Sequence, residues 1–358
     1  MNKRPLEILI FGTGAVGSTL GWRLAQNPYT RLSVVCRSNY DAVKRHGIQL
    51  RTSLWGNGQF RPHRVLTSTL QVHDVPFDYV VCTNKVTSLE SDSFIHAIAP
   101  AVSRGTTLVS AQNGIGVETP LRQAFRANTI LSAVCYISCL QPSPGLVQQV
   151  SSIRPHALHI GTFDERHSSD RELDHARLER FVALDPKFKL VSDVQAERWT
   201  KQVFNGSWNP ATAISGLDTH GLLAAAGPQL GVVEALAREI FTVAVRIGVA
   251  LPRDLPQRTV QFARDNPPIA PSMLQDARVQ RQMEVESLCG NIVRLADAVG
   301  VPVPTVKATY RTLLGMNRRF QALEQPVRMG DFLAQRPAVS HRLTPPLLDR
   351  IPAVSLAG

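Results

Sequence analysis

Three polar side chains, Lys201, Asn205 and Asn209, recur every four residues in a segment that also holds Trp199 and Phe204. A helix has about 3.6 residues per turn, so this spacing places the three on one face. Such a stripe is either exposed to solvent or lines a buried site. Asparagine is a poor helix former, so its use at two of these positions favours the buried site.

Two further polar side chains are expected at the ends of buried strands, where ligands bind in open α/β sheets. Lys85 follows one apolar strand, and Asn113 with Gly114 follows the next. Asn113 offers a donor and an acceptor, and Gly114 allows close approach of the backbone. The alternatives are a surface lysine that extends to solvent and an ordinary polar Asn-Gly turn.

Ser272 and Glu284 form the fourth candidate group. If one helix runs through both, they are about three turns apart, near its opposite ends. Glu284 is then placed to reach a hydroxyl group or a lysine. The alternative is a solvated helix carboxylate.

The glycines Gly12, Gly14 and Gly17 follow an apolar strand and lead into an amphipathic helix. Gly12 permits the tight turn, Gly14 lets the backbone approach a pyrophosphate, and Gly17 lets the helix pack on the strand. The helix N-terminus, with Ala15 and Val16, offers free N–H groups to the phosphates. The pattern therefore predicts a dinucleotide site rather than a turn without a ligand.

The end of the second strand predicts which dinucleotide binds. Proteins that bind NAD usually place an acidic residue about 20 positions after the glycines. Here Arg37 follows the strand Leu32–Cys36. A guanidinium group can bind a 2′-phosphate through paired hydrogen bonds, so we expect NADPH. The alternative is a solvated surface arginine in an arginine-rich chain.

Taken together, the motifs over about residues 6–315 resemble those of the ketopantoate reductase family, the 2-dehydropantoate 2-reductases. The motifs that carry the resemblance, in order, are Gly12-x-Gly14-x-x-Gly17, Asn84-Lys85, Gln112-Asn113-Gly114, Lys201-x-x-x-Asn205-x-x-x-Asn209-Pro210, and Ser272-Met273-Leu274-Gln275-Asp276 with Glu284. The resemblance implies a Rossmann domain joined to a helical domain, with the active site in the cleft between them. It also implies the NADPH-dependent reduction of a 2-keto acid.

The resemblance also implies a role for each matched residue. Lys201 matches the general acid, which protonates the carbonyl oxygen, and Glu284 matches the acidic group that orients the lysine and the substrate beside the cofactor. The other matched residues bind substrate or cofactor: Asn205, Asn209 and Ser272 hold the substrate, Lys85 and Asn113 lie near the nicotinamide and the substrate, and Arg37 binds the 2′-phosphate.

Two positions depart from the family pattern, and both concern substrate recognition. Family members often carry asparagines where this chain has Ile269 and Thr219. We therefore expect either ketopantoate or a bulkier or more apolar keto compound as the substrate. Two alternatives stay open: an oxidoreductase of the β-hydroxyacid dehydrogenase type, and an NADP-binding sensor without catalysis.

Composition narrows the class of protein further. The 358 residues are 44% hydrophobic and 19% charged, as in an ordinary globular enzyme, and the net charge is +11. The basic residues are scattered, so we do not expect nucleic acid as the main partner. No apolar run approaches membrane-spanning length, and no cleaved signal is expected. Five cysteines, including Cys135 and Cys139, lack a Cys-x-x-Cys pair, which favours reduced thiols and the cytoplasm. No histidine spacing is typical of a metal site.

Strands and helices are expected to alternate in the first half of the chain, as in a mostly parallel sheet with crossover helices. The expected strands end at Phe11, Cys36, Thr83 and Ala111, and a long strand covers 130–140. Two β segments, 145–150 and 157–163, are expected as antiparallel additions at the sheet edge, followed by a strand at 188–191. The crossover helices are expected at 18–25, 88–99, 115–127 and 176–184, with an irregular region at 39–73.

From about residue 195 helical periodicity predominates. The expected helices cover 196–208, 229–247, 254–264, 272–283, 285–298 and 305–320, of which 272–283 and 285–298 are open to being one helix. The predicted fold class is an α/β Rossmann domain at 1–194 with an all-α domain at 195–323. A proline-rich tail is expected at 324–358, and a homodimer stays open.

Overall fold

The structure is a computed structural model that describes residues 4–87, 91–163, 168–225 and 227–324. Its first part is built on eight strands: β1 (Leu6–Phe11), β2 (Thr30–Val35), β5 (Arg64–Leu66), β6 (Tyr79–Cys82), β7 (Thr107–Ser110), β8 (Ile130–Cys135), β11 (Leu158–Thr162) and β12 (Phe188–Leu190). They form one sheet in the order β12-β11-β8-β7-β6-β1-β2-β5. All neighbours are parallel except β11 and β8. The predicted mostly parallel sheet is confirmed.

Both faces of this sheet are buried, as a parallel sheet requires. Along β1, Ile8 and Ile10 pack into one apolar core, and Leu9 packs into a second core on the other face. The helices of this part are α1 (Ala15–Ala25), α2 (Tyr40–His46), α3 (Ser91–Ile98), α4 (Thr119–Ala124) and α5 (Ser168–Val182). The rigid sheet thereby fixes the ends of β1, β2, β6 and β7 along one edge.

A second, four-stranded sheet corrects two predictions. It consists of β3 (Ile48–Thr52), β4 (Gly56–Phe60), β9 (Ile137–Ser143) and β10 (Leu146–Ser152), in the order β4-β3-β10-β9. The predicted long strand 130–140 was wrong, because it divides into β8 and β9 in different sheets. The prediction for 145–150 was also wrong, because β10 pairs with β3 and β9 rather than with the main sheet. The segment predicted at 157–163 does pair antiparallel with the main sheet, as β11 with β8. It is not the edge strand, because β12 lies beyond it.

The chain changes sheets at Tyr136, whose N–H bonds to the residue before β11 and whose carbonyl bonds to the residue after β10. Its N–H donates to the Ala157 carbonyl at 2.8 Å, and its own carbonyl accepts from Ile153 at 2.9 Å. Both strands are apolar on their inner faces, so hydrophobicity runs unbroken through the junction and gives no sign of it.

The segment expected to be irregular, 39–73, carries most of its length in regular elements. It contains α2, β3, β4, β5 and a short 3-10 helix, Thr69–Val72. Two predicted crossover helices differ in extent. The helix expected at 115–127 is confined to α4, since the chain enters it through Gly116 at φ +72°. The helix expected at 176–184 begins earlier, as α5.

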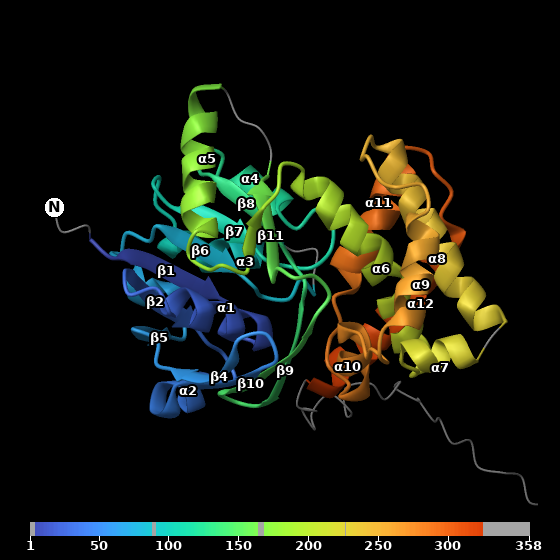
Figure 1. Cartoon of the computed structure of the whole chain (residues 1–358), viewed down its shortest axis with the longest axis horizontal. Helices are drawn as coiled ribbons and strands as arrows, with labels where there is room; N and C mark the ends of the chain where they lie inside the picture. The colour runs from blue at the N-terminus through green and yellow to red at the C-terminus, as the bar shows by residue number, and fades with distance from the viewer. Residues whose placement is uncertain (1–3, 88–90, 164–167, 226, 325–358) are drawn as a thin grey trace, which may run out of the picture.

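The second part of the chain is helical. Its helices are α6 (Val194–Ser215), α7 (Thr219–Ala224), α8 (Pro228–Arg246), α9 (Leu255–Asp265), α10 (Ser272–Arg278), a π-helical turn (Glu286–Gly290), α11 (Asn291–Ala298) and α12 (Pro304–Glu324). Figure 1 shows the two sheets with α1 to α5 on one side and the helices of the second part on the other, with α6 reaching between them. α6 packs against α8, α9, α10 and α12, and it also contacts β8 and β11.

Helix α6 runs past Pro210, and the expectation that it ends at Trp208 was wrong. A proline inside a helix costs about 3 kcal/mol. Trp208 and Thr212, on either side of Pro210, are fully buried among the neighbouring helices. Burial of a large side chain contributes a similar free energy, so tertiary packing outweighs the local cost. The helix ends at Gly216, which takes a left-handed conformation at φ +75°.

A single helix through Ser272 and Glu284 is ruled out. α10 ends at Arg278, and Gln280 then takes a positive φ of 52°. Arg281 returns to Asp276, with its Nε 2.8 Å from Oδ1. The turn brings Glu284 back toward the sheet instead of carrying it away along a helix axis.

The change from sheet to helix falls between β12 and α6, close to the predicted division at 194/195, which stays a prediction. Residues 325–358 of the predicted tail lie outside the described residues. Among the helices that the structure does describe, none has the length and apolar character needed to cross a membrane.

Candidate active site

The three glycines form the turn between β1 and α1. Gly12 has φ +99°, and a Cβ there would lie 2.4 Å from the Asn84 backbone nitrogen. A Cβ on Gly17 would lie 2.4 Å from the Gly12 carbonyl oxygen. By contrast, a Cβ on Gly14 would have no atom within 4 Å. Gly12 and Gly17 therefore serve close packing, and Gly14 faces open space.

This turn fits the phosphates of a dinucleotide. Gly14 caps α1 without a side-chain hydrogen bond, and the first turn of the helix carries no acidic residue. Its backbone N–H groups, including those of Ala15 and Val16, are thus neither shielded nor opposed by a carboxylate. A helix end of this kind attracts an anion.

Arg37 lies beside the same turn. The Thr13 N–H donates to the Val35 carbonyl at 3.2 Å, which joins the glycine turn to the end of β2. Asn39 holds the Thr13 carbonyl through Nδ2 at 2.6 Å. Arg37 itself is exposed. The Arg37 side chain is therefore accessible to solvent beside the glycine turn.

A chain of contacts leads from the glycine turn to the lysine. Thr83 Oγ1 donates to the Gly12 carbonyl at 2.7 Å. Gln112 Nε2 donates to the carbonyl of Asn84 at 3.1 Å and to its Oδ1 at 3.2 Å. The ends of β1, β6 and β7 are in this way fixed to one another, and Asn113 follows Gln112 directly.

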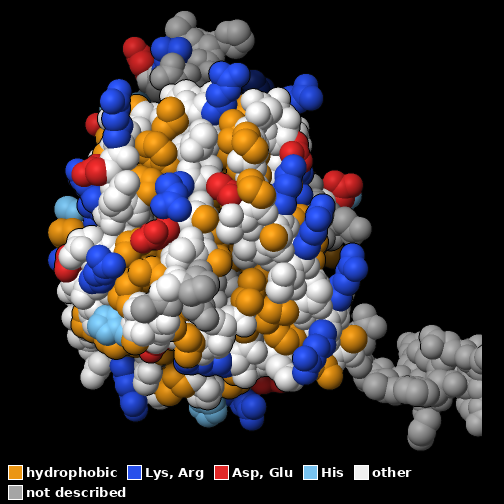
Figure 2. All heavy atoms as spheres, turned by 90° about the vertical axis from the view of Figure 1, so that its right-hand side faces the viewer, with side chains coloured by type: hydrophobic (Ala, Val, Ile, Leu, Met, Phe, Trp, Pro, Cys, Tyr) orange, Lys and Arg blue, Asp and Glu red, His pale blue; other side chains and the backbone are white. Residues whose placement is uncertain are grey.

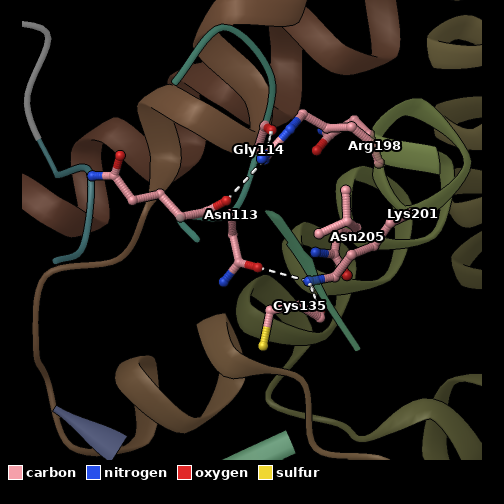
Figure 3. A pocket seen from close by; sticks show the side chains of 9 residues that line it. Asn113, Gly114, Cys135, Arg198, Lys201 and Asn205 are labelled. Atoms are coloured by element: carbon pink, nitrogen blue, oxygen red, sulfur yellow. Dashed lines mark hydrogen bonds between the residues drawn. The ribbon is translucent and has the colours of Figure 1, made fainter. Parts of the chain in front are cut away.

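Lys201 points from α6 toward this edge of the sheet. Its Nζ donates to Asn113 Oδ1 at 2.7 Å and to the carbonyl of Cys135 at the end of β8. Figure 3 shows Lys201, Asn113 and Cys135 converging on a pocket whose wall also includes Asn205. Asp193 is the N-cap of this helix, and its Oδ1 accepts from the Ala196 N–H at 2.9 Å.

Asn113 joins Lys201 to Glu284. Its Oδ1 accepts from the lysine, and its Nδ2 donates to Glu284 Oε2 at 3.4 Å. The Val86 N–H donates to the other oxygen, Oε1, at 3.2 Å. Lys201 and Glu284, which are 83 positions apart in the sequence, thus lie at the two ends of one amide.

Burial shifts the pKa values of Lys201 and Glu284, the two groups that Asn113 joins. The pKa of Lys201 is lowered, first by burial and also by the nearby positive charge of Arg198. The pKa of Glu284 is raised, chiefly by burial, although Lys85 and the hydrogen bonds from Val86 and Asn113 oppose that effect. Removal from water disfavours both charged forms, so the two pKa values move toward neutrality.

The remaining predicted residues do not all face the pocket. Asn209 is buried, and its Oδ1 accepts from Ser272 Oγ at 3.1 Å and from the Met273 N–H at 3.0 Å. These bonds fasten α10 to α6. Lys85 Nζ lies 2.5 Å from Asp276 Oδ2, so it joins the end of β6 to α10.

Two residues that the sequence analysis missed belong to this site: Arg198, and Cys135 through its carbonyl. Arg198 is only 3% exposed. It lies one position before Trp199 on the inner side of α6, and a charged residue beside buried aromatics was the available signal. The Cys135 carbonyl had no signal, because every residue type carries one.

The two departures from the family pattern bond to each other. The Ile269 N–H donates to Thr219 Oγ1 at 3.0 Å, and the Thr219 N–H donates to the Ile269 carbonyl at 3.1 Å. Thr219 is fully buried. Its hydroxyl is engaged with the backbone, and Ile269 offers an apolar side chain.

On the face that Figure 2 shows, positive charge is spread rather than gathered. Figure 2 shows the outer face of the helical part, where Lys and Arg side chains are separated by apolar and uncharged groups. Within the described part of the chain, no three His, Cys, Asp or Glu side chains are grouped closely enough to hold a metal ion.

Comparison with known proteins yields two family matches. Residues 8–165 match the model described as "Ketopantoate reductase PanE/ApbA", and residues 193–317 match its C-terminal counterpart. A 2-dehydropantoate 2-reductase of Mesorhizobium japonicum is 28% identical, over 85% of this chain and 95% of the relative. The uncharacterized yeast protein YDL144C is 26% identical, over 86% and 92%. The crystal structure of 2-dehydropantoate 2-reductase from Methylococcus capsulatus is 30% identical, with a TM-score of 0.73 over 90% of this chain and 99% of that one.

Proposed function

The chain belongs to the ketopantoate reductase family of oxidoreductases, and we propose that it reduces a 2-keto acid to a 2-hydroxy acid with NADPH. The observation that carries the proposal is the hydrogen-bonded series Lys201–Asn113–Glu284 at the edge of the sheet that also holds the glycine turn. A site that only binds a nucleotide has no use for a buried lysine and a buried carboxylate joined by one amide.

The cofactor would be held at the glycine turn: Gly14, Ala15 and Val16 would face its phosphates, Gly12 and Gly17 would give the turn its shape, and Arg37 would bind the 2′-phosphate. Lys85, Asn113 and Glu284 would border the nicotinamide end. When bound, NADPH supplies a hydride to the carbonyl carbon of the keto acid.

Lys201 acts as the general acid. Its ammonium transfers a proton to the carbonyl oxygen as the C=O π electrons move onto that oxygen, which becomes the hydroxyl of the product. Asn113 holds the ammonium in place by accepting one of its hydrogens. Glu284, through the same amide, keeps Asn113 turned with its oxygen toward the lysine. Asn205 reaches the substrate from the pocket wall, and Asn209 with Ser272 supports that wall.

For the substrate we propose 2-dehydropantoate or a related bulkier keto acid. Asparagine side chains at positions 219 and 269 would present amide groups, whereas here Thr219 is engaged with the backbone and Ile269 is apolar. A substrate with a large apolar group beside its carbonyl suits this composition. A panel of 2-keto acids of increasing size, followed by NADPH oxidation, tests the choice. High turnover of ketopantoate with rejection of larger acids would contradict the bulkier substrate.

Lys201→Ala tests the assignment of the general acid. We expect NADPH binding, followed by nucleotide fluorescence, to stay close to that of the wild type. Reduction should fall by about 10²- to 10⁴-fold, the range for loss of an acid–base group. Unchanged turnover would remove Lys201 from the mechanism, and an inactive wild type with intact NADPH binding would favour the sensor. The homodimer and the cytoplasmic location stay predictions.

A further inference from the structure

Arg198 contacts both residues that flank Asn113. Its Nη1 donates to the carbonyl of Gln112 at 2.8 Å and to the carbonyl of Gly114 at 3.1 Å. The Gln112 and Gly114 carbonyls belong to the turn after β7, and Arg198 belongs to α6. One guanidinium therefore spans the peptide units on either side of Asn113, as Figure 3 shows.

Arg198 also lies three positions before Lys201 on the same helix, so the two side chains project from adjacent turns. Lys201 bonds to the Asn113 side chain, and Arg198 bonds to the backbone around it. Both partners of the Lys201–Asn113 hydrogen bond are consequently attached to the same face of α6, Lys201 directly and Asn113 through Arg198.

The guanidinium is held by groups that are themselves buried. Its Nε lies 2.7 Å from Glu118 Oε1, and Arg198 and Glu118 side chains are 3% and 0% exposed. Ser132 Oγ donates to the same Glu118 oxygen at 2.5 Å and accepts from Arg198 Nη2 at 2.8 Å. A buried charge fixed from two sides has no room to change its rotamer.

We propose that Arg198, held by Glu118 and Ser132, is a positioning residue that sets the Asn113 amide against Lys201 and Glu284. This inference rests on the proposed reductase function. Arg198 touches no reacting atom, and it acts through the turn 112–114. Lysine cannot replace it, since a single ammonium lacks the planar fork that reaches two carbonyls and Ser132 at once.

The charge of Arg198 has a second effect on the same lysine. It adds to burial in lowering the pKa of Lys201. Loss of the guanidinium should therefore displace Asn113 and also raise the pKa of the general acid. A purely structural role would have no reason to move the basic limb of a pH profile.

The test compares Arg198→Lys, Arg198→Met and Ser132→Ala with a matched control, Arg23→Lys. Arg23 forms a similarly short ion pair with buried Asp185, at 2.7 Å, away from the pocket. Thermal unfolding establishes that each variant is folded. Steady-state kinetics give kcat, KM for NADPH and the pH profile, and hydrogen exchange of the peptide covering 112–116 reports on the turn directly.

For Arg198→Lys we expect kcat to fall by about 10- to 100-fold, the cost of a small misplacement of a catalytic group. KM for NADPH should change less than kcat, because Arg198 acts on the nicotinamide end only through Asn113 and the phosphates would be held at the glycine turn. The fall in kcat should be larger in Arg198→Met, and the basic limb of its pH profile should move to higher pH. Hydrogen exchange at 112–116 should quicken in both. If Arg198→Met fails to fold, Arg198→Lys and Ser132→Ala carry the same comparison.

An equal loss of kcat in Arg23→Lys would overturn the proposal, as would a folded Arg198→Lys with kcat unchanged. If the wild type shows no reduction at all, the proposed function fails. Hydrogen exchange of 112–116 alone then tests the positioning role of Arg198. If the amides of 112–116 exchange as slowly in Arg198→Lys as in the wild type, the proposed positioning role is wrong, whatever the activity.

Discussion

At the scale of single residues, the site consists of charged groups that are hidden from water and joined by one neutral amide. Lys201 and Glu284 do not form a direct ion pair among the described contacts, and Asn113 lies between them. An amide can donate and accept at once, so it orders both groups without neutralising either. The lysine is thus left available to give up its proton.

The pKa shifts predict a narrow pH optimum. The lysine must be protonated to donate, so activity is lost as pH rises through the lowered pKa of Lys201. The carboxylate orients the amide, so activity is also lost as pH falls through the raised pKa of Glu284. A profile of kcat/KM should therefore be bell-shaped, with limbs inside the ordinary values of about 4.3 and 10.4.

Glu284→Gln is the control for the acid limb, which should disappear in that variant while the basic limb persists. The other titratable groups near Lys201 are Cys135, Tyr136 and Arg198. Of these, burial raises the pKa of both Cys135 and Tyr136, so neither accounts for a limb near neutral pH. A flat profile between pH 5 and 10, the range set by the ordinary carboxyl and lysine values, would count against the assignment.

Arg37 makes a separate prediction about the cofactor. In Arg37→Ala, KM for NADPH should rise by about 10- to 100-fold, as expected when hydrogen bonds to a charged group are lost. KM for NADH should hardly change. Arg31→Ala, at the opposite end of the same strand, is the matched control, since Arg31 faces Glu7 at 3.6 Å. Equal loss with both nucleotides would show that Arg37 does not read the 2′-phosphate.

Residue types and spacing made Lys201, Asn113 and Glu284 candidates, and the resemblance to the family supplied their expected roles. The hydrogen bonds that join the three could not be predicted. That Asn113 bridges the other two depends on the turn after Arg278, which brings Glu284 back, and a helical pattern does not foresee that turn. Arg198 was missed for a related reason: its partners are carbonyl groups, which have no signature in side-chain type.

At the scale of elements, the glycine turn and helix α6 position everything else. Gly12 and Gly17 pack against backbone, and Gly14 faces open space. Gly12 and Gly17 therefore serve the packing of the turn, whereas Gly14 leaves space that we propose for the phosphates of the cofactor. Three glycines that look equivalent in the sequence have different roles.

Substitution separates these roles. Gly12→Ala should lower the unfolding free energy by about 1–3 kcal/mol or more, because φ is +99° and the Cβ meets Asn84. Gly14→Ala should leave the melting temperature nearly unchanged, since its Cβ meets nothing, but should raise KM for NADPH by about tenfold through a clash with the pyrophosphate. Differential scanning fluorimetry and cofactor titration measure the two effects. Equal destabilisation by both substitutions would contradict this division.

Local signals predicted the central strands and most helices, and they failed where tertiary packing decided. The sheet change at Tyr136 lies within the apolar run 130–140, so hydrophobicity alone gives no sign of it. Pro210 was expected to end α6, yet the burial of Trp208 and Thr212 keeps the helix intact. In both cases the determining contacts come from segments distant in sequence.

At the scale of the whole molecule, α6 connects the sheet part to the helical part. Lys201 and Arg198 reach from it to the sheet, and Asn209 fastens α10 to it. The ion pair between Lys85 and Asp276 closes the same junction from the other side. The pocket therefore lies where elements from both parts of the chain meet.

The net charge of +11 predicts that electrostatic attraction speeds the binding of an anionic substrate. Raising the salt concentration from about 10 mM to 150 mM shortens the Debye length from about 30 Å to about 8 Å. We expect kcat/KM for a keto acid to fall several-fold over this range, with kcat unchanged, because screening weakens attraction before binding. A neutral ketone substrate is the control, and an equal fall for it would exclude steering by charge.

The acceptor that Cys135 gives to Lys201 is a main-chain oxygen, although the Cys135 side chain lines the pocket. A change of the Cys135 side chain would therefore alter the wall of the pocket without removing the carbonyl that accepts from Lys201. Because Cys135 is 6% exposed and packs into the apolar core of the main sheet, only a side chain of similar volume is expected to fit there, and Lys201 would then keep its main-chain anchor.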